Sequence, residues 1–251
     1  MHSCSLHILP LLFGVLMIAT FIISYSMSVV AGNASTLFPY ISETGSFAPE
    51  SCVFGQLLNL SAFLAVLSIY CWYCHQLEKF ESLNSPKSHV VFARVTIGVG
   101  LLAAMGLSLV GNFQISTVLF VHLIGAFMSF GFGTLYMILI THTSRVHLKA
   151  PKWLWILRCI LTIVCTIVFA LSFVFMGLIS GSRVELSGKW TPEDKGYVFH
   201  TLNCTCEWLH SICFLLFFVS LAYELRDYTL DPVKTRYRYE NVETGSSPAR
   251  I

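Results

Sequence analysis

The stretch that decides the fold is Val95–Ser144, which reads VTIGVGLLAAMGLSLVGNFQISTVLFVHLIGAFMSFGFGTLYMILITHTS. It holds no aspartate, glutamate, lysine or arginine. About 20 apolar residues are enough to cross the hydrocarbon core of a bilayer, so this stretch is too long for a single crossing. The segment Gly111-Asn112-Phe113-Gln114 interrupts it with small and polar residues. We therefore expect two membrane-spanning helices that are joined as a hairpin at this turn.

The whole chain has the composition of a multi-pass membrane protein. Of its 251 residues, 55% are hydrophobic and only 11% are charged, and the mean hydropathy is +0.72. A soluble domain usually carries about a quarter of charged residues, and a soluble chain this apolar would expose large patches and aggregate. The net charge is only +2. Composition therefore excludes a soluble enzyme, a disordered chain and a nucleic-acid-binding protein.

Further apolar runs flank the hairpin on both sides. We predict an all-α fold, a bundle of six transmembrane helices formed by residues 1–225. A polar tail, residues 226–251, is predicted to be cytosolic and disordered. The six predicted spans are Ile8–Val30, Phe54–Cys74, Val90–Val110, Thr117–Thr141, Leu154–Ile179 and Leu202–Tyr223.

The basic residues predict the orientation of the bundle. Twelve of the fifteen lysines and arginines lie in the 75–94 connection, in the 142–158 connection, which includes Arg158, and in the tail. The 31–53 loop carries none. Because basic residues concentrate on the cytosolic side of a membrane, we expect both termini in the cytosol. The 31–53 and 180–201 loops should then face the lumen or the exterior.

Polar residues of the last span fall on one helix face. His200, Asn203, Glu207 and His210 follow one another at steps of three, four and three residues. A carboxylate inside hydrocarbon costs about 2.5 kcal/mol or more, so this face should point into the bundle. One interpretation is a pH-responsive or ligand-binding cluster. The other is a set of hydrogen bonds that only holds the helices together.

Other polar residues fall at a similar depth in the lumenal half. We predict that they form, with the last span, a polar pocket open to the lumen in which Glu207 is the only acid. In an acidic lumen histidine becomes protonated and a desolvated glutamate keeps its proton, so the pocket would change charge with pH. The pair Glu207-x-x-His210 has the spacing of half a di-metal site, but no second half follows, so we predict no metal and no cofactor. The predicted pocket comprises Gln56, Asn59, Asn112, Gln114, His122, His200, Asn203, Glu207 and His210.

Small residues recur at every fourth position in the hairpin. Gly100, Ala104 and Ser108 form one ridge, and Gly125, Ser129 and Gly133 form the other. Small side chains let two helices approach closely in lipid, so we expect the two ridges to meet, with Gly133 at the contact.

Four motifs in a fixed order carry a family resemblance. They are Pro39-Tyr40-Ile41-Ser42-Glu43-Thr44-Gly45 with Pro49-Glu50-Ser51-Cys52-x-Phe54, then Gly111-Asn112-Phe113-Gln114, then Trp190-Thr191-Pro192-Glu193-Asp194-Lys195-Gly196-Tyr197-Val198 with His200, and Cys206-Glu207-Trp208. Together they resemble the damage-regulated autophagy modulator (DRAM) proteins, over nearly the whole chain except the tail. The resemblance implies a six-span lysosomal or endosomal protein that promotes autophagy and has no established catalytic chemistry. Glu43 stands where the resemblance leads us to expect aspartate.

Two short motifs concern trafficking and modification. Asn33-Ala34-Ser35 is an acceptor for N-glycosylation on the predicted lumenal side. In the tail, Tyr239 and Val242 fit a tyrosine-based sorting signal that an endosomal sorting adaptor would read. The basic residues around Tyr237 are alternatively a contact with anionic lipids, worth about 1 kcal/mol for each residue near the surface.

These observations favour a non-enzymatic autophagy modulator in a lysosomal or late endosomal membrane. One alternative is a transporter or scramblase of a lipid or small solute that uses the lumenal pocket. Another is a plasma-membrane scaffold that recruits phosphoinositide kinases, which the wider family resemblance suggests. A third is an intramembrane enzyme of lipid remodelling, although the sequence presents no recognisable catalytic set.

Overall fold

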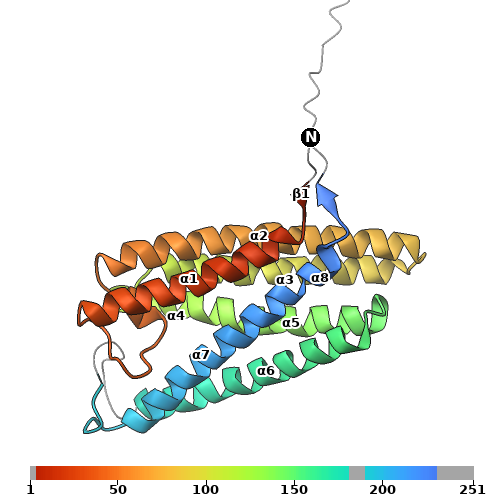
Figure 1. The fold of residues 1–251 in the computed structure, drawn as a ribbon. Coiled ribbons are helices and arrows are strands. Elements are labelled where there is room, and N and C mark those ends of the chain that lie inside the picture. The colour runs from red at the N-terminus through yellow and green to blue at the C-terminus, as the bar shows by residue number, and fades with distance from the viewer. Residues whose placement is uncertain (1–3, 181–189, 231–251) are drawn as a thin grey trace, which may run out of the picture.

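A computed structural model describes residues 4–180 and 190–230 of the chain. Figure 1 shows a bundle of long helices with a short strand pair that projects from one side of it. The elements in chain order are β1 (Cys4–Ser5), α1 (Ile8–Val30), the 3₁₀ turn η1 (Ser42–Gly45), α2 (Glu50–Ser82), α3 (Lys87–Asn112), α4 (Leu119–Phe127), the π-helical turn η2 (Met128–Phe132), α5 (Gly133–His142), the π-helical turn η3 (Thr143–His147), α6 (Lys152–Ser180), α7 (Tyr197–Ser220), α8 (Ala222–Leu225) and β2 (Thr229–Leu230).

The prediction of an all-α bundle with six spans is confirmed. Among the described residues, six helical segments are long and apolar enough to cross a membrane. The fourth segment, Leu119–His147, joins α4, η2, α5 and η3, and the sixth, Tyr197–Leu225, joins α7 and α8. Several helices extend beyond their predicted spans, most clearly α2. Its 33 residues cover about 50 Å at about 1.5 Å each, well beyond the roughly 30 Å of hydrocarbon.

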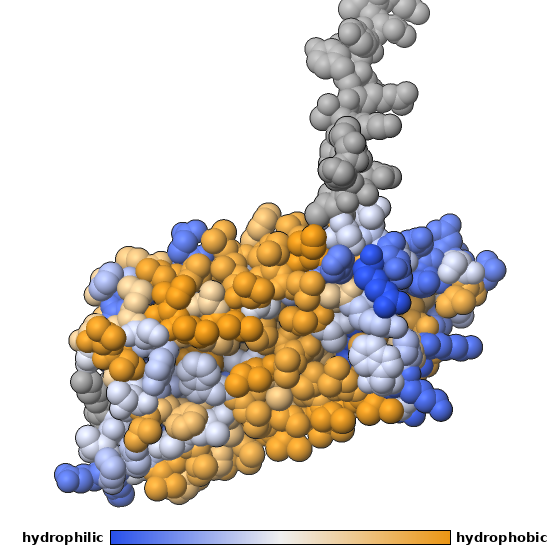
Figure 2. All heavy atoms as spheres, in the orientation of Figure 1, coloured by the Kyte–Doolittle hydropathy of each residue, from blue (hydrophilic) through white to orange (hydrophobic). Residues whose placement is uncertain are grey.

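The surface of the bundle is built for lipid. Figure 2 shows hydrophobic side chains over the middle of the visible face, and hydrophilic side chains gather most densely at one end. Large apolar side chains such as Val15 and Ile22 are 66% and 62% exposed. Exposure on this scale is unfavourable in water, whereas acyl chains accept it without cost. The chain is therefore a multi-pass membrane protein.

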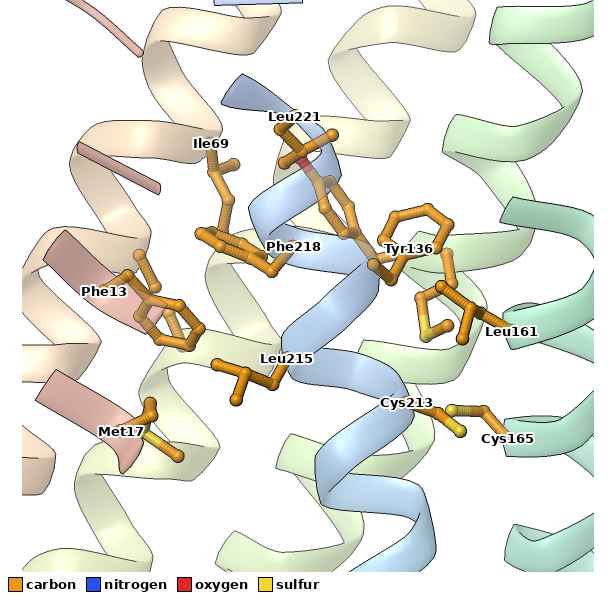
Figure 3. Close-up of a cluster of buried hydrophobic side chains, with 14 of the residues drawn as sticks. Phe13, Met17, Ile69, Tyr136, Leu161, Cys165, Cys213, Leu215, Phe218 and Leu221 are labelled. Atoms are coloured by element: carbon orange, nitrogen blue, oxygen red, sulfur yellow. The ribbon is translucent and has the colours of Figure 1, made fainter. Parts of the chain in front are cut away.

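Helix α7 is the central element of the bundle. It crosses the face seen in Figure 1 diagonally and packs against α6, α1 and α5, while α2 packs against α3 and α1. Figure 3 shows the buried apolar side chains that surround it. This core includes Phe13 and Met17 of α1, Ile69 of α2, Tyr136 of α5, Leu161 and Cys165 of α6, and Cys213, Leu215 and Phe218 of α7.

Both described ends of the chain lie at the same end of the bundle. β1 and β2 pair as antiparallel strands, with Ser5 opposite Thr229, and the amide of Leu6 donates a hydrogen bond of 2.9 Å to the carbonyl of Tyr228. An even number of crossings requires this arrangement. The side of the membrane on which these ends lie stays a prediction.

The close contact between α3 and the fourth span includes Gly125 and Ser129 of the second predicted ridge, but its α3 residue is Gly106, which lies outside the first predicted ridge. A Cβ atom on Gly106 would lie 2.7 Å from the carbonyl oxygen of Gly125, and one on Gly125 would lie 3.1 Å from the carbonyl oxygen of Gly106. Gly133 instead faces Phe214 of α7, and a Cβ atom added to Gly133 would lie 3.0 Å from the ring of Phe214. The wider π-helical turn η2 separates Gly125 from Gly133 and changes the register, so Gly133 leaves the α3 contact.

Replacing Gly106 with alanine should therefore destabilise the bundle. The new methyl group would overlap the backbone of Gly125 and Ser129, and overpacking of this kind typically costs about 1–3 kcal/mol. Gly98 lies on the same helix with open space around its Cβ position, so Gly98→Ala is the matched control. We expect a lower thermal unfolding midpoint in detergent for Gly106→Ala but not for Gly98→Ala. Equal midpoints would contradict the close contact.

The structure corrects the place of Arg158, which the charge pattern assigns to a cytosolic connection. Arg158 lies within α6 and is fully buried. Its Nη2 lies 2.8 Å from Oε2 of Glu224, its Nη1 donates to Oγ of Ser144 at 2.6 Å, and its Nε donates to Oγ of Ser220 at 3.0 Å. A charge near the end of a span resembles a loop charge in the sequence, and only its burial against the sixth span shows otherwise.

Removing the acid of this pair should destabilise the protein strongly. Glu224→Ala would leave a buried guanidinium without its carboxylate, which typically costs about 3–5 kcal/mol. It would also remove the acceptor of the Trp72 indole N–H, which lies 2.8 Å from Oε2 of Glu224. We expect a large fall in the thermal unfolding midpoint. The double variant Arg158→Met, Glu224→Leu should recover most of it, and no recovery would argue against an uncompensated charge as the cause.

Candidate functional site

The candidate site lies where the α1–α2 loop (residues 31–49) meets the first half of α7. The side-chain amide of Asn203 donates a hydrogen bond of 2.9 Å to the hydroxyl of Tyr40. One step further along α7, Oε2 of Glu207 accepts the backbone N–H of Ile41 at 3.2 Å. These contacts give the polar face of α7 partners inside the protein instead of in lipid.

The local sequence of the loop prepares it for this contact. The amide of Tyr40 donates to Oε2 of Glu43 at 3.0 Å, and the amide of Glu43 donates to the carbonyl of Tyr40 at 3.1 Å. This reciprocal pattern closes the turn η1 and lets the neighbouring amide of Ile41 point toward α7. Tyr40 is buried in this turn, and burial raises the pKa of its hydroxyl, which therefore stays protonated and keeps its hydrogen for donation.

His200 sits in an aromatic cage at the entrance of α7. Its ring stacks on the indole of Trp190 with centroids 4.4 Å apart, and the ring of Tyr40 meets it edge-on at 4.9 Å. Its Nε2 lies 4.0 Å from Oε1 of Glu43, a carboxylate that is only 7% exposed. Glu43 is thus a second buried acid near the cluster, beside His200, whereas Glu207 is the acid that lines the cavity described below. Glu43 was missed because an acid in a loop is normally read as solvated.

His122 and His210 lie deeper, on two different spans. Nδ1 of His122 lies 2.7 Å from the carbonyl oxygen of Phe113, and Nε2 of His210 lies 3.4 Å from Oγ1 of Thr134. Both side chains are 3% exposed. Together with Asn203 and Glu207 they line one cavity of about 270 Å³. The structure thus brings together four of the residues that the sequence places in the pocket, with His200 one turn above them.

The remaining predicted pocket residues do not line this cavity. Asn59 of α2 and Asn112 of α3 exchange amide hydrogen bonds of 3.0 Å in both directions, and Ser108 donates to Oδ1 of Asn59 at 2.6 Å. Gln56 is exposed, and Gln114 accepts a hydrogen bond of 3.4 Å within its own turn. The hydrogen bonds among Asn59, Asn112 and Ser108 join α2 to α3.

Two further predicted sites have different outcomes. The side-chain amide of Asn33 donates to Oε1 of Glu50 at 2.6 Å, and Glu50 is 1% exposed, so the nitrogen that would carry a glycan is already engaged. Glycosylation of Asn33 stays a prediction. The sorting signal at Tyr239 and Val242 lies outside the described residues.

The chemistry available at the site is hydrogen bonding by carboxylates, imidazoles and an amide. Across residues 4–180 and 190–230, no group of three or more histidine, cysteine or acidic residues is placed to hold a metal ion. The sequence showed the helix face that carries Glu207, but it did not show its partners. Tyr40, Glu43 and Trp190 belong to the motifs of the family resemblance, and that membership was the signal available for them.

The contact between Glu207 and the loop can be tested at a single position. Glu207→Leu removes the acceptor of the Ile41 amide, and a buried donor without a partner costs about 1–3 kcal/mol. Glu207→Gln keeps a carbonyl oxygen at this place and is the matched control. Hydrogen exchange should accelerate at the amide of Ile41 and its neighbours in Glu207→Leu, and stay near wild type in Glu207→Gln. Unchanged exchange in the leucine variant would contradict the contact.

Comparisons with known proteins agree with this architecture. Residues 5–228 match the family model described as "Frag1/DRAM/Sfk1/Cwh43P N-terminal domain". The chain is 34% identical over 241 residues to bovine DNA damage-regulated autophagy modulator protein 2, covering 92% of this chain and 88% of the relative. It is 36% identical over 224 residues to the human protein 2, covering 84% and 81% respectively.

Human DNA damage-regulated autophagy modulator protein 1 is 32% identical over 216 residues, covering 84% of this chain and 87% of the relative. No solved structure matches the chain. The family model covers all six spans and both segments that form the candidate site, the α1–α2 loop and α7. The chain therefore belongs to the Frag1/DRAM family of multi-pass membrane proteins.

Proposed function

We propose that this chain is a lysosomal or late endosomal membrane protein that promotes autophagy and does not itself catalyse a reaction. The observation that carries the proposal is the similarity to relatives named as autophagy modulators, which covers between 84% and 92% of the chain. The family model spans residues 5–228 and so includes all six spans, which is why the function should belong to the six-span unit.

The proposal includes an orientation and a division of the chain. The bundle of residues 1–225 crosses the membrane with both ends in the cytosol, and residues 226–251 form a cytosolic tail. The paired strands beside the bundle support this, because they hold both described ends at one end of it. The positions of the basic residues support it as well. The tail then presents Tyr239 and Val242 to a sorting adaptor and its basic residues to anionic lipids.

In this orientation the candidate site faces the lumen. Histidine is the side chain whose ordinary charge change falls between neutral and lysosomal pH. An imidazolium at His200 would face the carboxylate of Glu43 at 4.0 Å, on the same loop that holds Glu207. The site is thus equipped to report lumenal acidity through the α1–α2 loop.

Transport or scrambling of a lipid or small solute, and recruitment of phosphoinositide kinases at the plasma membrane, are the competing functions. The location of the protein distinguishes kinase recruitment from the proposal, because a kinase scaffold acts at the cell surface. Flux of a tracer across liposomes that contain the purified protein distinguishes transport or scrambling from it.

Replacing Tyr239 should remove the protein from its place of action. In cells depleted of the endogenous chain, the tagged wild type should colocalise with lysosomes and restore the turnover of a lipidated autophagosome marker. Tyr239→Ala should accumulate at the plasma membrane and fail to restore it, because the adaptor signal is lost, whereas Tyr237→Ala serves as the matched tail control. Wild-type protein at the cell surface, or restored turnover without lysosomal residence, would refute the proposal.

A further inference from the structure

We propose that the cavity between α4 and α6 is a binding site for a single membrane amphiphile whose head group donates hydrogen bonds, a long-chain alcohol or a long-chain amine. The ligand would enter sideways from the bilayer and place its head group at Glu207. This inference goes beyond the proposed role in autophagy and does not depend on it.

The packing of the helices leaves space between α4 and α6. Helix α4 packs mainly against α3, whereas α6 packs mainly against α7 and α5. The walls between them are apolar and largely aromatic, with Phe130, Phe169 and Met176 among the residues that line the cavity. Walls of this kind suit a hydrocarbon body and offer it little competition from water.

One side of the cavity, its mouth, opens at the lipid-facing surface of the bundle. Phe127 of α4 and Phe173 of α6 line it and are 51% and 55% exposed, as parts of the lipid-facing surface. Their ring centroids lie 6.3 Å apart, and the ring of Phe127 lies 6.2 Å from that of Phe169. The two helices therefore meet across the mouth through flexible side chains, which can part without moving the backbone.

The inner end of the cavity is polar and acidic. Glu207 lines it together with Asn203, His122 and His210, of which the last three are buried and Glu207 is half-buried. Among the described residues that line the cavity, Glu207 is the one acid, and none is a lysine or arginine. A phosphate or carboxylate head group would meet this acid without a cation to bind it, whereas a hydroxyl or ammonium group donates to a carboxylate favourably.

The size of the cavity favours one chain over a whole phospholipid. Its volume of about 270 Å³ lies just below the range of roughly 300–1,000 Å³ for sites that enclose a drug-sized ligand. It accommodates a small head group and the adjoining part of one chain, while the rest of the chain stays in the bilayer. A lipid with a large head group, or one with two acyl chains, would not pass between α4 and α6.

The test uses the purified full-length chain in phosphatidylcholine liposomes with three photoactivatable, alkyne-tagged probes of equal chain length. They are a long-chain alcohol, a long-chain amine and a fatty acid. We expect the alcohol or the amine to label the protein about tenfold more than the fatty acid, with adducts on α4 or α6. Equal labelling by the fatty acid, or adducts confined to other helices, would overturn the proposal.

Variants on α6 locate the site. Ser172 lines the cavity, so Ser172→Trp should fill it and abolish the preferential labelling. Val174 is 56% exposed on the same helix and does not line the cavity, so Val174→Trp is the matched control for bulk and should label like wild type. Each variant is first checked for wild-type elution and thermal stability. Undiminished labelling of folded Ser172→Trp would overturn the assignment, and if that variant does not fold, the mapped adducts decide.

Glu207→Gln distinguishes the two donor head groups. Glutamine keeps an acceptor oxygen but loses the negative charge, so an ammonium ligand should lose about tenfold in labelling while a hydroxyl ligand should keep most of it. Either pattern supports the site and names the ligand class. The contrary outcome is that, in Glu207→Gln, both donor probes keep full labelling and labelling by the fatty-acid probe does not rise. This would show that Glu207 does not receive the head group, and would overturn that part of the proposal.

Discussion

Each charge or polar group in the spans of this bundle must find its partner within the protein, because hydrocarbon offers none. The sixth span meets this requirement at two positions. Glu207 accepts the amide of Ile41 from the α1–α2 loop, and Glu224 receives the buried guanidinium of Arg158. Glu207 lies within α7 and Glu224 in α8, so the two contacts are made at different depths of the same span. Together they set the rotation and the depth of the sixth span relative to the α1–α2 loop and to α6.

Apolar packing then fills the space that the polar contacts define. In lipid the hydrophobic effect does not drive helices together, so close fit has to supply the stabilisation. The crossing of α3 and α4 at Gly106 and Gly125 brings two backbones into contact, which only residues without a side chain permit. The core around Phe13, Leu215 and Phe218 does the same with interlocking large side chains. Glycine therefore stabilises the bundle by letting backbones approach, and phenylalanine by filling the space between helices.

Sequence-based predictions were accurate where the physical effect acts between residues close in sequence, and failed where it acts between distant segments. Hydropathy is local, so the six spans were predicted correctly, although helices such as Glu50–Ser82 continue past the apolar core. The burial of Arg158 depends on residues of another span, and the pairing of Tyr40 with Asn203 joins segments 163 residues apart, so no local pattern could reveal them. Gly133 was misplaced because a π-helical turn changed the helical period that the prediction assumed.

The double position of Glu207 has a thermodynamic consequence. Its carboxylate holds the α1–α2 loop through Ile41 and also lines the cavity that opens between α4 and α6. Any ligand that hydrogen-bonds to this carboxylate changes the free energy of the loop contact, and by linkage the state of the loop changes the affinity of the ligand by the same factor. Because Glu43 of that loop faces His200 of α7, the protonation of this pair is part of the same linkage. One side chain thus couples the cavity to the α1–α2 loop, which two separate sites in the same bundle would not do.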